Sequence, residues 1–256
     1  MIALAAAAVS ALLLAPASPG AAAARPPVGL VAAPSRLALA GAAPQTIRVS
    51  NSGAEPIVVD VAPAGFALDL RGRPKVVRRA AAASWLSVRP RRLGLQPGRA
   101  ATLTLSATLP PRAAPGDHPT LVLLTTRPRR GADLAIRMRI GIVVVVRVPG
   151  TIKHRLELRT LRVRRLGAGR LLELSLANRG NVSERLEPGR VRVSFLRRGR
   201  VVARLRPPGR EVLPRSAGID EFRYRGRLRG FVTAVVEVAP PAHGAAVVRR
   251  TFRIRL

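Results

Sequence analysis

The stretch Trp85-Leu-Ser-Val-Arg-Pro-Arg-Arg-Leu-Gly-Leu-Gln-Pro-Gly98, followed by Ala101-Thr-Leu-Thr-Leu-Ser-Ala-Thr-Leu109, decides the fold of this chain. It carries the only tryptophan, then a Pro-Gly turn, then a run with an apolar residue at every second position. A period of two is typical of a β-strand with one buried face, whereas an amphipathic helix repeats its apolar residues every three to four positions. The stretch therefore predicts strand, turn and strand, with Trp85 pinning the core of a sandwich.

Strand patterns of the same kind recur at short intervals on both sides of this stretch. Turn signals such as Asn51-Ser-Gly53 and Pro115-Gly-Asp117 separate them, and no convincing amphipathic helix intervenes, although residues 77–84 suit a helical turn or an ordered loop. We expect strands at residues 36–40, 45–50, 57–61, 66–70, 85–88, 101–109, 119–126, 135–148, 156–163, 170–178, 191–196, 201–205, 221–224, 231–238 and 246–256. Strands of this density predict an all-β protein of two tandem immunoglobulin-like sandwiches.

The two halves of the chain echo each other. Ile47-Arg-Val-Ser-Asn51-Ser-Gly53 is matched in type by Leu174-Ser-Leu-Ala-Asn178-Arg-Gly180, and Leu95-Gln-Pro-Gly98 by Leu213-Pro-Arg-Ser216. The 256 residues suffice for two domains of about 100 to 130 residues. We expect the first domain at residues 25–150 and the second at residues 151–256.

The N-terminus has the pattern of a secretory signal peptide. An apolar run from Ile2 to Leu14 precedes the candidate cleavage triplets Ala15-Pro-Ala17 and Ala22-Ala-Ala24. No basic residue precedes the run, which favours a translation start upstream of Met1. The run is shorter than the roughly 20 residues that a membrane span needs. We therefore expect a signal peptide at residues 1–24, export to the cell envelope, and no transmembrane helix after signal removal.

The net charge of +32 favours polyanionic partners. All but two of the 45 basic residues are arginines, and many alternate with apolar residues, as in Arg190-Val-Arg-Val-Ser-Phe195. This is typical of strands with one solvated face. Peripheral contact with an anionic membrane fits such a charge. Dedicated nucleic-acid binding is not expected, because aromatic residues make up only 3% and no recognition helix is evident.

No motif for catalysis, a metal or a cofactor is present. Cysteine is absent, and His118, His154 and His243 have no acidic or serine partner at a recognisable spacing. Asn181-Val-Ser183 matches the N-glycosylation sequon and fits a turn equally well. We expect a non-enzymatic protein without a cofactor or catalytic residue.

The segment Ile140-Gly-Ile-Val-Val-Val-Val-Arg147-Val148 is apolar on both faces and allows two interpretations. It could be a central strand, buried between its sheet and the neighbouring domain. It could instead be an edge that pairs with a partner's strand through Ile142, Val144 and Val146. Candidate anion contacts are Arg36, Arg139 and Arg147.

The turn and strand motifs of the chain resemble those of the bacterial WxL-interacting cell-surface proteins. The residues that carry the resemblance are Val49-Ser-Asn51-Ser-Gly53-x-x-Pro56, Trp85, Leu95-x-Pro-Gly98, Pro115-Gly-Asp117-His118 and Arg139-x-Gly141-(x)5-Arg147-Val148-Pro149-Gly150 in the first half, and Asn178-Arg-Gly180, Val212-Leu-Pro214 and Gly230-Phe-Val-Thr-Ala-Val-Val-Glu-Val238 in the second. The resemblance implies a peptidoglycan-binding first domain and a partner-binding second domain. It thus predicts binding to a cell-wall polymer, a surface protein, or both.

The chain is similar, as an alternative, to the pilus chaperones, which also have two sandwiches. Such chaperones complement a client subunit with a strand and hold the client's terminal carboxylate with basic residues in the cleft between domains. The resemblance implies Arg36 and Arg147 for that role.

Overall fold

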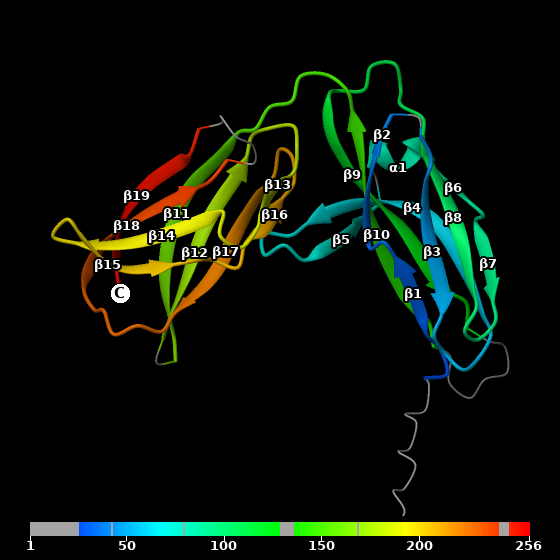
Figure 1. Cartoon of the computed structure of the whole chain (residues 1–256), viewed down its shortest axis with the longest axis horizontal. Coiled ribbons are helices and arrows are strands. Elements are labelled where there is room, and N and C mark those ends of the chain that lie inside the picture. Colours follow the sequence, from blue (N-terminus) through cyan, green and yellow to red (C-terminus); the bar gives the residue numbers. More distant parts are fainter. Residues whose placement is uncertain (1–25, 42, 79, 129–135, 168, 241–245) are drawn as a thin grey trace, which may run out of the picture.

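A computed structural model describes residues 26–41, 43–78, 80–128, 136–167, 169–240 and 246–256. The chain forms two tandem immunoglobulin-like β-sandwiches, so the predicted all-β fold is confirmed (Figure 1). It passes from the first sandwich to the second between Val148 and Leu156. The exact limits 25–150 and 151–256 stay a prediction, and the expected signal peptide lies outside the described residues. Within them, no helix is both apolar and long enough to cross a bilayer.

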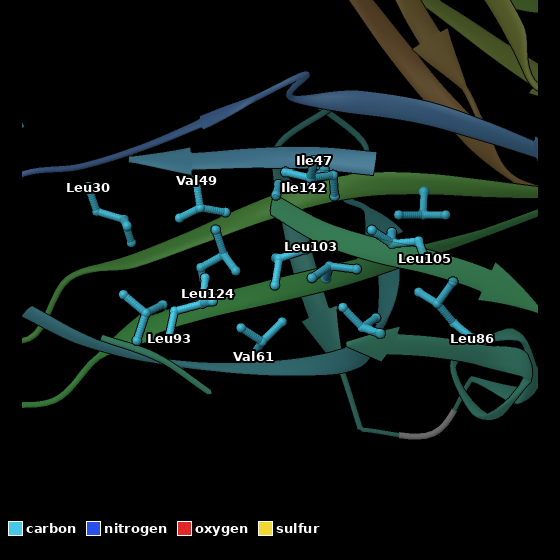
Figure 2. Close-up of a cluster of buried hydrophobic side chains, with 14 of the residues drawn as sticks. Leu30, Ile47, Val49, Val61, Leu86, Leu93, Leu103, Leu105, Leu124 and Ile142 are labelled. Atoms are coloured by element: carbon cyan, nitrogen blue, oxygen red, sulfur yellow. The ribbon is translucent and has the colours of Figure 1, made fainter. Parts of the chain in front are cut away.

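The first sandwich packs a four-stranded sheet against a six-stranded sheet. The four-stranded sheet has the order β1 (Leu30–Ala33), β3 (Gln45–Asn51), β8 (Ala100–Ala107) and β6 (Leu86–Arg89). The six-stranded sheet has the order β2 (Arg36–Ala40), β10 (Arg139–Val148), β9 (Gly116–Thr126), β4 (Ile57–Leu68) and β5 (Pro74–Val77), with β7 (Arg92–Leu95) also paired to β4. Alternate apolar residues of both sheets, among them Ile47, Leu103 and Leu124, fill the core between them (Figure 2).

The second sandwich is built in the same way from shorter sheets. One sheet has the order β11 (Leu156–Leu166), β12 (Gly169–Asn178) and β17 (Ala217–Tyr224). The other has the order β15 (Arg200–Leu205), β14 (Val191–Arg197), β18 (Phe231–Val238) and β19 (Val248–Arg255). A ribbon of β13 (Glu184–Leu186) and β16 (Arg210–Val212) faces the first sandwich (Figure 1). Phe195 and three leucines of β12, Leu172, Leu174 and Leu176, are fully buried in this core.

The sequence similarity between the two halves corresponds to the same asparagine-centred turn, which occurs once in each sandwich. Asn51 Nδ2 donates to the carbonyls of Glu55 and Leu95, and its Oδ1 accepts from the Gly53 N–H at 2.9 Å. Asn178 does the same in the second sandwich: Nδ2 donates to Val182 and Val212, and Oδ1 accepts from the Gly180 N–H at 2.8 Å. Each asparagine thus ties the end of a strand to two later segments of its own sandwich.

Trp85 does not open a strand, as the sequence predicted, but ends the short helix α1 (Ala81–Trp85). Its ring is only partly buried, packs against the edge of the first core, and lies with its centroid 4.8 Å from that of His118. The alanine run before Trp85 explains the difference, because alanine has the highest helix propensity of the amino acids. The centre of the core belongs to aliphatic side chains instead.

Candidate functional site: the cleft between the sandwiches and the edge of strand β10

Hydrogen bonds fix the two sandwiches against each other at the connection between them. The Asp117 N–H donates to the Asn181 carbonyl at 2.8 Å. Asn181 Nδ2 donates to the carbonyls of Pro115 and Thr151, and Asn181 Oδ1 accepts from the Lys153 N–H at 2.7 Å. All the polar atoms of this side chain are therefore used within the junction, which favours the turn interpretation of the Asn181-Val-Ser183 sequence over a glycosylation site.

The hairpin between β4 and β5 makes a second junction, which reaches across to β17 (Figure 1). The Leu70 carbonyl accepts from the Ile219 N–H at 2.7 Å and from Arg210 Nη1 at 2.6 Å. Arg71 Nε lies 2.9 Å from Glu221 Oε1, and this carboxylate raises the pKa of the Arg71 guanidinium. Beside the hairpin, Phe66 and Leu121 of the first sandwich enclose Leu213 of the second in a small apolar cluster. We call these contacts the clasp.

The buried Asp220 lies near the half-buried Arg210 of the clasp. Arg210 also donates to the Ile219 carbonyl, and burial lowers the pKa of its guanidinium. Asp220 is only 3% exposed, and its Oδ2 has no hydrogen-bond partner in the part of the chain that the structure describes. Burial raises the pKa of Asp220 to about 6, and the attraction of Arg210 offsets this only in part.

A cleft of about 860 Å³ opens between the sandwiches on the side of β2 and β10. It is lined by Arg36, Leu37, Ala38, Asp117, Val145, Arg147, Ser183, Glu184, Arg185, Glu187, Arg190 and Pro240. The first sandwich and the second both contribute charged side chains. A polar cleft of this size between two domains is a common position for a binding site.

Two of the three candidate anion contacts meet in this cleft. Both terminal nitrogens of Arg36 lie 2.6 Å from the carboxylate of Glu211, a bidentate pair that crosses between the sandwiches. Arg147 Nε lies 2.5 Å from Asp117 Oδ1, and the structure shows no hydrogen bond from the Arg147 Nη atoms to the described residues. Arg139 is not part of the cleft, because it begins β10 whereas Arg147 nearly ends it, about 26 Å away along the strand.

Buried polar groups stand behind the arginines of the cleft. Asp117 is buried, and its Oδ2 accepts from the Ser183 N–H at 2.9 Å. Glu184 is buried as well and binds His154 Nδ1 at 2.7 Å, with Arg190 Nη2 at 3.5 Å. The Ser183 hydroxyl lies in the same lining and has no partner among the described residues. The cleft therefore offers the Arg147 Nη atoms to an incoming carboxylate, whereas the Ser183 hydroxyl is buried behind them.

Strand β10 is closed on one side and half open on the other. Its whole length, Arg139 to Val148, pairs with β9 without a break in register. On the opposite side β2 pairs in parallel, but only with residues from Val143 to Arg147. Within the described residues, the backbone from Arg139 to Ile142 therefore has a free edge. We call this segment the open edge.

The predicted edge side chains lie inside the first core rather than at a surface. Ile142, Val144 and Val146 are 0%, 0% and 1% exposed, and Ile142 is visible in the core cluster of Figure 2. The backbone of the two valines is also covered by β2. They cannot fill pockets of a partner without leaving their own core. A role for this strand in binding a partner stays a prediction, and the open edge is the part of it left accessible.

The residues at the start of the open edge and just before it belong to the strand predicted from the sequence over residues 135–148. Ile136, Met138 and Ile140 are partly buried and alternate with the exposed Arg137 and Arg139. Met138 also pairs with Thr126 through the Met138 N–H, at 2.8 Å from the threonine hydroxyl. Alternation in Arg137-Met-Arg-Ile140 was the signal available, but it does not tell an open edge from an ordinary outer face.

The histidines form no metal site with the described residues. His154 binds Glu184, His118 lies against Trp85 with Nε2 2.7 Å from the Ala114 carbonyl, and His243 lies outside the described residues. No group of three or more histidine or acidic side chains suited to a metal ion occurs in the described ranges.

Comparison with known proteins gives relatives by structure alone. No family model matches the chain, and no curated protein matches it. A chain of a chaperone–tip adhesin complex, described as vital for synergistic activation of CFA/I fimbriae biogenesis, is 12% identical with a TM-score of 0.51, covering 87% of this chain and 98% of that one. The class 5 fimbriae chaperone CfaA is 10% identical with a TM-score of 0.53, also covering 87% of this chain and 98% of its own. At this identity the likeness shows the fold.

These comparisons correct the functional interpretation of the sequence. The resemblance to WxL-interacting proteins has no support, because no family model matches the chain. Binding to a cell-wall polymer is contradicted, since the solved structures that match nearly the whole chain are fimbrial chaperone structures. The mistaken resemblance rested on turns and strand ends, which any tandem pair of immunoglobulin-like sandwiches shares.

Proposed function

We propose that this protein is a non-enzymatic, extracytoplasmic chaperone of pilus type, which holds a client subunit by adding a strand of its own to the client's sheet. The open edge carries the proposal, because its unpaired N–H and C=O groups are a template for a further strand. Export rests on the expected signal peptide at residues 1–24. The partner is thus a surface protein.

The side chains around the open edge suit this role. Ile136 and Met138, just before β10, and Ile140 within it form a row of partly exposed apolar groups at every second position. Successive residues of a strand point to opposite faces, so these three alternate with arginines that stay in water. A client that lacks one strand would gain main-chain hydrogen bonds from the edge and apolar contacts from the row.

The cleft suits the end of the client's chain. A client strand on the open edge would be collinear with β2, because both pair with the same side of β10. In a client strand that runs parallel to β10, as β2 does, the last residue would lie next to Arg36, the first residue of β2, which lines the cleft. Arg36 and Arg147 would hold the terminal carboxylate through charge-assisted hydrogen bonds, with Arg36 exchanging Glu211 for the client.

A pair of synthetic peptides tests the proposal. Both have the same alternating valine and threonine sequence, and one ends in a free carboxylate and the other in an amide. We expect the acid peptide to bind in fluorescence anisotropy and to protect the backbone amides of the open edge from hydrogen exchange. The amide peptide should bind about tenfold or more weakly, since a hydrogen bond to a charged group contributes about 1.5–3 kcal/mol.

Variants locate the binding. Arg36→Ala and Arg147→Ala should each weaken binding of the acid peptide about as much as amidation does. Ile140→Asp should weaken binding of both peptides. Arg48→Ala is the matched control, because it removes one exposed arginine from β3, in the other sheet of the first sandwich and away from both the cleft and the open edge. Equal binding of the two peptides would refute the carboxylate site. Protection of another edge strand, such as β15, in place of the open edge would refute the strand-complementation proposal.

A further inference from the structure

Four separate segments meet at the end of the second sandwich that faces away from the cleft. The β14–β15 hairpin, the start of β18 and the end of β19 lie together, because Leu196 pairs with Thr233 and Phe231 pairs with Arg255. The β11–β12 hairpin joins them, since Arg170 pairs with Tyr224, from which the chain runs on to β18. We call residues 165–167, 169–170, 197–202, 223–231 and 253–256 the distal tip.

All the charged side chains of the distal tip are arginines. Its four segments contain eleven arginines and no aspartate or glutamate: Arg165, Arg170, Arg197, Arg198, Arg200, Arg223, Arg225, Arg227, Arg229, Arg253 and Arg255. None of them forms an ion pair with a carboxylate of the described residues. Arg197 and Arg229 donate to carbonyls within the tip, which leaves their charge uncompensated.

Apolar side chains are exposed among these arginines. Phe231 is 59% exposed, and Leu166, Val201 and Val202 are each more than 40% exposed. The Arg253 and Arg255 guanidinium carbons lie 5.0 and 5.7 Å from the centroid of the Phe231 ring, so the ring is flanked by cations. Apolar side chains at the ends of loops, ringed by cations, are typical of a surface that lies in the interface of a bilayer.

The distal tip also contains a small basic pocket of about 320 Å³. Leu166, Gly169 and Tyr224 form its apolar part, and Arg170, Arg223 and Arg225 surround it. Three arginines beside a recess suit a phosphate group, because a guanidinium can donate two parallel hydrogen bonds to its oxygens. The volume suits a lipid headgroup.

We propose that the distal tip is a docking surface for an anionic lipid bilayer, with Phe231 and its apolar neighbours entering the interface and the arginines binding lipid phosphates. Charge complementarity with the negative membrane surface supplies the attraction. Nucleic acid fits less well, because Phe231 is the only exposed aromatic among the described residues of the tip, whereas single strands are bound by rows of stacked aromatics. This inference does not depend on the chaperone function.

Vesicle co-sedimentation of the full chain tests the proposal, with phosphatidylglycerol-containing vesicles compared to pure phosphatidylcholine. We expect binding to the anionic vesicles alone. The double variant R253Q/R255Q should lower the partition coefficient about 25-fold, since each arginine near an anionic surface contributes about a fivefold factor. Phe231→Ser should weaken binding without changing the net charge. All these positions are exposed, so folding should be retained, which circular dichroism checks.

The matched control is R48Q/R89Q, which removes the same charge from exposed strands of the first sandwich. It should leave the partition coefficient within about threefold of the unmodified chain, because these arginines lie far beyond a Debye length from the docked surface. An equal loss in the control, or no binding to anionic vesicles at low salt, would overturn the proposal. So would R253Q/R255Q losing duplex DNA binding while keeping its vesicle binding, which would assign the tip to nucleic acid.

Discussion

Replacing Asp220 by Asn should stabilise the protein at neutral pH and remove a specific part of its pH dependence. Asp220 points into the second core beside Phe222, and its Oδ2 is buried without a partner among the described residues. The amide of Asp220→Asn has nearly the same shape and no charge. The substitution therefore removes the cost of burying a carboxylate while keeping the packing.

The magnitude follows from the pKa of Asp220, which is about 6 in the folded protein against 3.8 for an unperturbed aspartate. Between these two pH values the folded state holds a proton that the unfolded state has released. The free energy of unfolding therefore falls as pH rises through this window and is constant above it. The difference corresponds to about 3 kcal/mol. Asp220→Asn should raise the free energy of unfolding at pH 7 by about 2–3 kcal/mol and flatten the window.

Two natural reporters make the assay specific to each sandwich. Trp85, the only tryptophan, lies in the first, and Tyr224, the only tyrosine, lies in the core of the second. Urea unfolding followed by Tyr224 at a series of pH values measures the effect. The control Glu237→Gln removes an exposed carboxylate and should change stability by less than about 0.5 kcal/mol. A D220N variant less stable at pH 7, or with an unchanged slope between pH 4 and 6, would refute the reasoning.

Two further predictions concern the cores. Asn51→Ala should cost about 2–4 kcal/mol and Asn178→Ala a similar amount, because each leaves three backbone groups unpaired; in urea unfolding the first should shift the Trp85 transition and the second the Tyr224 transition, and the reverse assignment would contradict the two matched corners. Trp85→Ala should cost about 2–3 kcal/mol, below the 3–5 kcal/mol of a fully buried aromatic, because its ring is only partly buried; circular dichroism of thermal unfolding measures this, and a cost of 5 kcal/mol would place the ring in the core after all.

The sequence predicted the strands that carry alternation. Residues 36–40 and 231–238 match β2 and β18 residue for residue, and the paired asparagine motifs mark the same corner in both sandwiches. The short strands β1, β5, β7, β13 and β16 were missed. They have three or four residues each, too few to display a period, and they are set by the partners that they pair with.

The site was less predictable because it depends on contacts between distant segments. Arg36 and Arg147 were nominated, but their partners were not: Glu211 lies 175 residues from Arg36. The division of β10 into a covered half and an open half is set by where β2 begins to pair. The alternation of apolar and polar residues in one strand predicts which of its side chains are buried, but it does not predict which other strand pairs with it.

The clasp and the Asn181 junction give the molecule two separate points of attachment between its halves. Two domains joined at one point can rotate relative to each other, whereas a second point of attachment restricts this rotation. A Cβ on Gly116 would come within 2.1 Å of the Asn181 carbonyl, so the backbones of the two sandwiches are in close contact at this junction. In the proposed docking on a bilayer, these two attachments would fix the distance and orientation of the open edge relative to the membrane.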